Sequence, residues 1–259
     1  MKRSDLDLRR DQIIALLAEN GALSAQELCT RLDVSVQTIR ADLRDLDEAA
    51  LVQRRNGMAQ LRQQAENIGY LPRLSLSHGE KHCIAQAVQP LVKNGARVAL
   101  GTGTTVAQCA RLLATRQDLF VASNSIHAVM ALQNAPGAQV DMAGGSVRLR
   151  DLDVISSASI EFFAHYRMEQ AIFSCGGISP SGEVLDYNSE EIAARQAITN
   201  CARQTILVVD SEKFGLDLPC RALNIWDYDV VVTGAELCPQ LRQLCHDNGC
   251  KILLAGSPL

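Results

Sequence analysis

Apolar residues in the first fifty positions recur at the three- and four-residue spacing of helices. A first helix ends near Gly21, and its apolar stripe consists of Leu8, Ile13, Leu16 and Leu17. Ser24, followed three residues later by Glu27, forms the capping box of a second, short helix. A tight turn then leads into a third helix over about 36–49. The pattern therefore predicts three short helices in succession.

The third helix lies in the stretch LDVSVQTIRADLRDLDE, which holds five acidic residues and two arginines. At 100° per residue, Ile39, Leu43 and Leu46 fall in one sector that must face the other helices. A separate face carries Gln37, Arg40, Ala41 and Arg44. The acidic residues Asp42 and Asp45 lie away from this face. The arginines are therefore expected on the outer face, without the acids.

A hairpin follows the third helix. The chain alternates into two short strands around Asn56-Gly57, a turn pair typical of hairpins. Three helices and a basic hairpin predict a winged helix-turn-helix, with its last helix in the major groove and its wing on the backbone or minor groove. The candidate DNA contacts are Ser35, Gln37, Thr38, Arg40, Arg44, Arg54, Arg55 and Asn56. A three-helix cap on a metabolic enzyme is the plainer interpretation of the same pattern.

The rest of the chain predicts a second domain. Residues 62–78 show little periodicity and hold a Gly and a Pro, which is typical of a linker between domains at 1–61 and 79–259. Apolar runs predict strands at 97–101, 119–123, 139–144, 170–175, 205–210, 228–234 and 251–255. Helical stretches alternate with them at 79–93, 104–115, 125–134, 156–166, 189–202 and 236–247. This order predicts a mostly parallel α/β sheet covered on both faces.

Composition and charge narrow the function classes. The 259 residues carry a net charge of -4, which argues against general binding of polyanions. Residues 1–62 hold ten basic and ten acidic residues, so any DNA contact must come from local arrangement. No stretch has the length and apolarity of a membrane span, and the nine scattered cysteines favour a reduced, cytosolic protein. A zinc site at Cys245, His246 and Cys250 lacks a second ligand pair, so no metal or other cofactor is expected.

A small-molecule site is predicted at the carboxyl ends of the strands, where ligands of such sheets bind. After the first strand, Gly101, Thr102, Gly103, Thr104 and Thr105 lead into a helix, and such a loop offers N–H and hydroxyl donors to a phosphate. The loop matches neither the P-loop nor the dinucleotide fingerprint, and a plain glycine turn with a threonine cap is the alternative. Later strand ends contribute Asn124, Gly145 and Lys213. Because these residues meet at one edge of the sheet, together they favour a ligand site there.

The segment VSVQTIRADLRDLDEAALVQRRNG resembles the N-terminal signature of DeoR-type repressors of sugar metabolism. GTGTT, SNS, GGSVR and VVDSEKFG resemble successive landmarks of the effector domain of that family. The resemblance implies a domain similar in fold to ribose-5-phosphate isomerase, with phosphate at the 102–105 loop and Asn124, Lys213, Asp186 and Glu191 approaching the sugar. Three positions depart from the family pattern: Ala50 and Met58 replace glycines, and Gly101 replaces an aspartate.

Two other function classes compete with a regulator. The isomerases have a paired-aspartate stretch and a lysine where this chain reads AHYRMEQAIFSCGG, so we expect binding without catalysis and no catalytic residues. A sugar-phosphate isomerase with an accessory helical domain is the main alternative, and a sugar-phosphate-binding protein with a protein-contacting head is the third. We predict a repressor of a carbohydrate operon that binds operator DNA and a phosphorylated sugar. The resemblance also implies a homo-oligomer.

Overall fold

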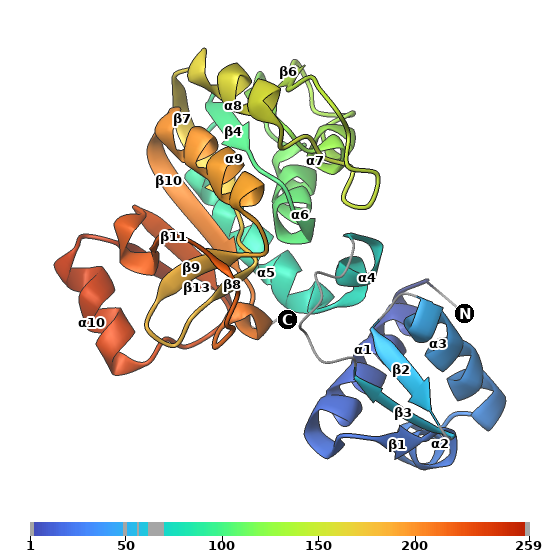
Figure 1. Ribbon diagram of the computed structural model, residues 1–259. Coiled ribbons are helices and arrows are strands. Elements are labelled where there is room, and N and C mark those ends of the chain that lie inside the picture. Colours follow the sequence, from blue (N-terminus) through green and yellow to red (C-terminus); the bar gives the residue numbers. More distant parts are fainter. Residues whose placement is uncertain (1–2, 49–50, 56, 62–69, 257–259) are drawn as a thin grey trace. The chain divides into compact units, whose positions relative to one another are not determined.

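The computed structural model describes residues 3–48, 51–55, 57–61 and 70–256, and these divide into two compact units, Met1–His78 and Gly79–Leu259. Each unit is described by itself (Figure 1). The predicted DNA contact Asn56, the end of the third helix at Ala49 and the linker positions 62–69 lie outside the described residues.

Unit 1 contains the three predicted helices and the predicted hairpin. Its elements are α1 Arg3–Asn20, β1 Leu23–Ser24, α2 Ala25–Leu32, α3 Val36–Glu48, β2 Val52–Arg55, β3 Met58–Leu61 and α4 Tyr70–Ser75. The antiparallel sheet has the order β1-β3-β2. Strand β1 was not predicted, because its two residues carry no alternation of their own. The short helix α4 lies in the segment that the sequence predicted as a linker.

Local capping explains where the helices of unit 1 begin and end. Ser24 and Glu27 form the predicted capping box at the start of α2. Asp33 ends α2 in the left-handed conformation, with a φ of 51°, and so turns the chain toward α3. The core of unit 1 is apolar and draws on all three helices and the hairpin, with Ile13, Leu28, Ile39, Leu46 and Val52 fully or almost fully buried.

Unit 2 is a three-layer α/β domain (Figure 1). Its helices are α5 His78–Val88, α6 Thr104–Leu113, α7 Ile126–Ala131, α8 Ser157–Ala164, α9 Ser189–Asn200 and α10 Pro239–Asp247, with short 3₁₀ turns at Gln89–Leu91, Ser211–Lys213 and Ile225–Asp227. Its main sheet consists of β4 Arg97–Leu100, β5 Phe120–Ser123, β6 Gln139–Met142, β7 Met168–Phe173, β10 Ala202–Val209, β12 Val230–Thr233 and β13 Lys251–Leu254. All seven predicted strands are present, and all their pairings are parallel.

Strand residues alternate between two cores, one on each face of the sheet. Along β4, Val98 and Leu100 pack with helices α5, α6 and α7, whereas Ala99 belongs to the core shared with α8, α9 and α10. Residues from β10 divide in the same way, with Ile206 and Val208 on the first face and Leu207 on the second. Burial on both faces accounts for the continuous apolar runs in the sequence.

A second, smaller sheet was missed by the sequence prediction. Strands β8 Gly177–Ile178, β9 Glu183–Asp186 and β11 Cys220–Asn224 form an antiparallel sheet of order β11-β9-β8. These segments are short and rich in turn residues, so neither periodicity nor apolar content distinguishes them from loops.

Two predicted helix ends differ from the structure at prolines. The helix predicted at 79–93 ends earlier, because Pro90 falls in a 3₁₀ turn after α5, and the helix predicted at 236–247 begins later, with Pro239 as the first residue of α10.

The strand order creates a topological switch point. The main sheet has the order β13-β12-β10-β7-β4-β5-β6, so the chain winds in one direction from β4 and in the other from β7. In doubly wound sheets of this type, ligands bind in the crevice outside the carboxyl ends at the switch point. The loops after β4 and β7 therefore flank the expected binding crevice.

Within the part of the chain that the structure describes, no helix combines the length and apolarity needed to cross a bilayer.

Candidate functional site

The outer face of α3 carries the side chains predicted to contact DNA. Gln37, Arg40 and Arg44 are exposed, while Ile39, Leu43 and Leu46 are buried against the other helices of unit 1. The two faces that follow from helical geometry are therefore present in the structure.

Two predicted contact residues cap the start of α3. The Ser35 hydroxyl accepts a hydrogen bond from the Thr38 N–H at 3.1 Å, and the two hydroxyls lie 2.8 Å apart. This arrangement satisfies one of the free N–H groups of the first turn. Both side chains thus have a structural partner in unit 1.

Two acidic residues of α3, Asp42 and Asp45, pair with arginines of α1. Asp42 is only 2% exposed and accepts hydrogen bonds from Arg9, with Arg9 Nε 2.6 Å from Oδ2. Arg10 pairs with both Asp42 and Asp45. The hydrogen bond to Asp42 also raises the pKa of Arg9. Asp42 and Asp45 therefore stabilise the packing of α1 on α3 and take no part in the outer face that carries Arg40 and Arg44.

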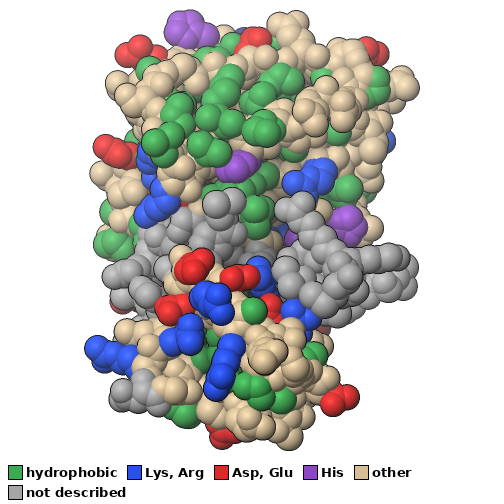
Figure 2. All heavy atoms as spheres, turned by 90° about the vertical axis from the view of Figure 1, so that its right-hand side faces the viewer, with side chains coloured by type: hydrophobic (Ala, Val, Ile, Leu, Met, Phe, Trp, Pro, Cys, Tyr) green, Lys and Arg blue, Asp and Glu red, His purple; other side chains and the backbone are tan. Residues whose placement is uncertain are grey.

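A groove lies between α3 and the wing. It is lined by Ala25, Arg40, Leu43, Arg54, Gly57, Met58 and Ala59. Arg40 and Arg54 bring positive charge to this groove from two different elements, and Arg55 is exposed in the next position of β2. Figure 2 shows several Lys and Arg side chains on one face of unit 1, with Asp and Glu side chains among them. A groove with cationic walls suits a sugar-phosphate backbone.

In unit 2, the loop after β4 lies at the switch point of the main sheet. Gly103 precedes α6 with a φ of 109°, a conformation that favours glycine, and a Cβ at this position would lie 3.8 Å from the Ser174 Cβ. Gly101 packs closely on β7, where its Cβ would lie 3.1 Å from the Phe173 Cβ. Thr104 and Thr105 are buried in the first turn of α6, and Thr102 is half-buried. The loop thus faces the end of β7 across a short distance.

Asn124 lies beside this loop, because Leu100 and Ser123 are register partners of β4 and β5. Its Nδ2 donates to the Val154 carbonyl at 2.8 Å, which fixes the amide. The other amide atom, Oδ1, is buried and has no hydrogen-bond partner. An unmatched buried acceptor costs about 1–3 kcal/mol, so a ligand donor at this position would stabilise the site.

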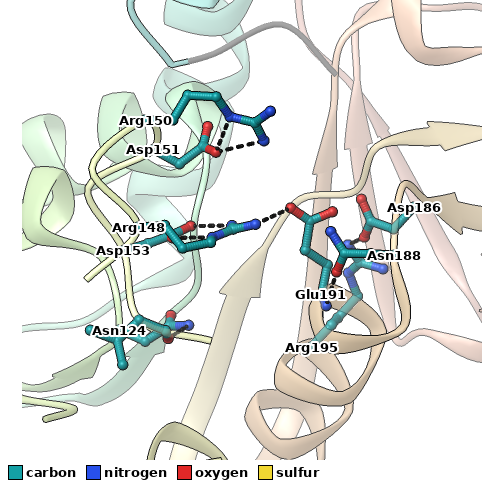
Figure 3. Close-up of polar contacts among 10 residues, drawn as sticks. Asn124, Arg148, Arg150, Asp151, Asp153, Asp186, Asn188, Glu191 and Arg195 are labelled. Carbon is teal, nitrogen blue, oxygen red and sulfur yellow. Dashed lines mark hydrogen bonds and ion pairs between the residues drawn. The ribbon is translucent and has the colours of Figure 1, made fainter. Parts of the chain in front are cut away.

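Arg148 connects the loop after β6 to helix α9 (Figure 3). Its Nε and Nη2 donate to the two carboxylate oxygens of Asp153 at 2.7 and 2.8 Å. Its Nη1 donates to Glu191 Oε1 at 2.8 Å, while Glu191 Oε2 is buried without a partner. Burial alone would lower the pKa of Arg148, but the bonds to Asp153 and Glu191 outweigh burial and raise it. The guanidinium is therefore a fixed positive charge between two carboxylates.

Asp186 forms an ion pair with Arg195, another residue of α9. Arg195 Nε donates to the Ser174 carbonyl at 2.9 Å, so it also holds the loop after β7. Burial raises the pKa of Cys175, while the nearby charges of Arg195 and Lys213 oppose that rise. Two cationic side chains therefore lie near the carboxyl end of β7.

The turn that carries Lys213 is attached to α5. Glu80 accepts hydrogen bonds from the N–H and the hydroxyl of Ser211, each at 2.7 Å. A Cβ at Gly234 would lie 2.3 Å from Glu80 Oε1, so this carboxylate fits closely against the end of β12 as well. The carboxyl ends of β10 and β12 are thus tied to the first helix of unit 2.

The structure brings most of the predicted effector residues to one edge of the main sheet. Gly145, also predicted, lies in the exposed loop after β6 with a φ of 129°. Three polar residues of this edge were missed as site residues: Arg148, Arg195 and Glu80. Each has a partner more than twenty positions away, and that contact cannot be predicted from the local sequence. Among the described residues, no group of three potential metal ligands comes together.

Family comparisons agree with this two-unit organisation. The model of the DeoR-like helix-turn-helix domain matches residues 9–65, and the model of the DeoR C-terminal sensor domain matches residues 76–235. The chain belongs to the DeoR family. The predicted fold class, a winged helix-turn-helix followed by a mostly parallel α/β domain, is also confirmed.

Several curated DeoR relatives align over almost their whole length. The glycerol-3-phosphate regulon repressor of Haemophilus influenzae is 36% identical over 234 residues, which cover 90% of each chain. The Escherichia coli repressor of the same name is 30% identical over 240 residues, or 93% of this chain and 95% of that protein. Among solved structures, ribose 5-phosphate isomerase from Plasmodium falciparum has a TM-score of 0.37 at 14% identity, over 52% of this chain and 51% of that one.

These relatives confirm the prediction of a DeoR-type transcriptional repressor with a DNA-binding unit and a sensor domain. Because proteins similar along nearly the whole chain are repressors, the isomerase alternative is not favoured and the DeoR-family protein is not an enzyme.

Proposed function

We propose that α3 binds in the major groove of operator DNA, with the wing on the adjacent backbone. The observation that carries this proposal is the separation of charge on α3: Arg40 and Arg44 are exposed, whereas Asp42 is buried against Arg9. Arginine can bind phosphates or guanine edges, and Gln37 suits an adenine edge. Ser35 and Thr38 contribute at the start of α3, and Arg54 and Arg55 contact the backbone.

The effector in this proposal is a small phosphorylated sugar or polyol bound at the switch-point crevice. Its phosphate binds at Gly101–Thr105, where the N–H groups of α6 favour an anion. The unpartnered acceptors of Asn124 and Glu191 receive hydrogen bonds from its hydroxyl groups. Lys213 adds positive charge at the end of β10. Glycerol 3-phosphate is the first candidate, because two relatives are named for its regulon.

Regulation requires that the effector bind two states of the protein with different affinity. We propose repression of a carbohydrate operon by a homo-oligomer, since winged-helix proteins that bind paired half-sites present two recognition helices. Residues 62–78 connect the DNA-binding unit to the sensor unit.

Thermal shift and gel shift with the full chain test this function. Glycerol 3-phosphate at 100 times its dissociation constant should stabilise the protein by about 2.7 kcal/mol, and it should change the affinity for DNA from upstream of the gene. Pentose and hexose phosphates form the rest of the screen. Absence of binding to that DNA at low salt would contradict the DNA-binding proposal, and conversion of a sugar phosphate at an enzymatic rate would contradict the regulator.

A double variant locates the effector site. Thr104→Val with Lys213→Ala removes a hydroxyl from the proposed phosphate loop and a positive charge from the end of β10, so the effector response should be lost while DNA affinity remains. Arg203→Ala, at an exposed position of β10, is a control for the loss of one positive charge. A normal response of the double variant would show that the effector binds elsewhere.

A further inference from the structure

Two buried acceptors at the effector site have no partner, and both belong to side chains held by one loop. The loop 148–154 contributes Arg148, which holds Glu191, and the Val154 carbonyl, which holds Asn124. In each case one polar atom of the side chain is fixed and the other, Glu191 Oε2 or Asn124 Oδ1, is left free. The loop therefore sets the direction of both free acceptors.

Arg148 is itself rigidly placed. Asp153, almost fully buried, binds the guanidinium through both oxygens, and the Arg148 N–H donates to the Asp153 carbonyl at 2.9 Å. The bidentate contact fixes the plane of the guanidinium, so only its Nη1 side is directed at α9. Figure 3 shows Arg148 extending from the loop toward the Glu191 carboxylate.

The Glu191 carboxylate is fixed at both ends of its side chain. At its backbone end, the Glu191 N–H donates to the Asn188 Oδ1 at 2.9 Å, which caps α9. At the carboxylate end, Arg148 binds Oε1 alone. A glutamate in the first turn of a helix otherwise rotates freely about its side-chain bonds, so Arg148 removes the freedom that a ligand would have to remove on binding.

We propose that Arg148 is a positioning residue for effector recognition: it orients Glu191 so that Oε2 accepts a hydrogen bond from an effector hydroxyl. The inference rests on the proposed effector site and goes beyond it, because it assigns selection for hydroxylated ligands to a residue that need not touch the ligand. Arg148 affects the hydroxyl contact and leaves the phosphate contact at Gly101–Thr105 unchanged.

Calorimetry with two phosphate esters separates these contacts. Glycerol 3-phosphate and propyl phosphate share the phosphate and the three-carbon chain, but only the first carries hydroxyl groups. We expect full-length protein to bind glycerol 3-phosphate at least about tenfold more tightly than propyl phosphate. In Arg148→Met this ratio should fall several-fold, as far as in Glu191→Ala, with propyl phosphate affinity unchanged. Arg148→Lys, which keeps the charge, should restore part of the ratio.

Two further variants keep the test decisive. Arg148→Met leaves the buried Asp153 without its partner, so Arg148→Met with Asp153→Asn removes that charge and protects the fold. Arg150→Met is the matched control, because Arg150 is two positions away and pairs with Asp151 at 3.0 Å. The control should keep the wild-type ratio.

A wild-type ratio in Arg148→Met, together with a reduced ratio in Glu191→Ala, would overturn the positioning role. A wild-type protein that binds both esters equally would also overturn it, because no hydroxyl contact would exist. Failure of the wild-type protein to bind either ester would instead contradict the proposed effector site.

Discussion

Arg9 of α1 and Asp42 of α3 are joined by two hydrogen bonds, of 2.6 and 3.2 Å. The pair is separated by 33 positions in the sequence and lies on the inner side of α3. It therefore fixes the packing of α3 on α1 from behind, while the outer face of α3 remains available for DNA. A buried carboxylate is stable here only because the guanidinium compensates it.

Asp42→Ala should destabilise unit 1 by about 2–3 kcal/mol, because Arg9 would lose its partner in a partly buried position. Asp45→Ala is the matched control, since Asp45 is about half exposed and its ion pair with Arg10 contributes about 0–1 kcal/mol. The single tryptophan, Trp226, lies in unit 2, so its fluorescence follows that unit, whereas circular dichroism follows both. In urea, Asp42→Ala should shift the unfolding curve followed by circular dichroism and leave the curve followed by tryptophan fluorescence unchanged. Equal effects of the two variants would contradict the structural role of the pair.

Arg40→Ala should weaken operator binding by about 1–3 kcal/mol, since Arg40 is exposed on α3 and lines the groove toward the wing. Fluorescence anisotropy over a range of salt concentrations measures the loss. If Arg40 binds a phosphate, the slope of the logarithm of operator affinity against the logarithm of salt concentration should become shallower by about one in Arg40→Ala. Effector binding and the unfolding midpoint should remain those of the wild type. Unchanged operator affinity would mean that α3 does not present this face to DNA.

Gly103→Ala should destabilise unit 2 by about 1–3 kcal/mol, because the φ of 109° is strained for any residue with a Cβ. It should also weaken binding of inorganic phosphate, because the start of α6 would shift. Gly144→Ala provides the comparison: Gly144 has no left-handed φ, and its Cβ would meet nothing within 4 Å. Its effect should lie between zero and a gain of about 1 kcal/mol. Tryptophan fluorescence in urea measures the stability of both variants. Similar losses of stability in Gly103→Ala and Gly144→Ala would argue against strain at Gly103.

The Cys109 thiol should make the protein sensitive to alkaline pH. Burial raises the pKa of Cys109 to about 12, whereas the ordinary value is 9.0. The folded state therefore keeps its proton while the unfolded state loses it, so stability is complete below about pH 9 and decreases as the pH rises toward 12. The melting temperature of Cys109→Ala should fall less steeply than that of the wild type between pH 8.5 and about 10.5. If the melting temperatures of the two proteins fell in parallel, the Cys109 thiol would have the same pKa in the folded and unfolded states.

Much of the fold could be predicted because its elements carry repeating patterns. The Ser24–Glu27 capping box and the two faces of α3 follow from helical spacing alone, and the seven strands of the main sheet follow from buried aliphatic runs. Their observed ends differ from prediction by a few residues, because hydrogen bonding and not composition decides where a strand stops. The sheet of β8, β9 and β11 has no such pattern, and only tertiary packing reveals it.

The candidate site was predictable in its glycine and hydroxyl components and not in its ion pairs. Glu191 was expected near the sugar from the family resemblance, but its bond to Arg148 spans 43 positions and depends on the course of the loop after β6. Asp186 was expected near a sugar, and in the structure it forms an ion pair with Arg195. Side-chain direction in such loops is set by long-range contacts, which a single sequence does not specify.

The bonds between Glu80 and Ser211 place a mechanical connection at the start of unit 2. Glu80 follows the boundary at His78–Gly79 by one residue, and Ser211 begins the turn that ends at Lys213. Any movement of the turn that carries Lys213 would therefore have to break these two bonds or move the first turn of α5 with it.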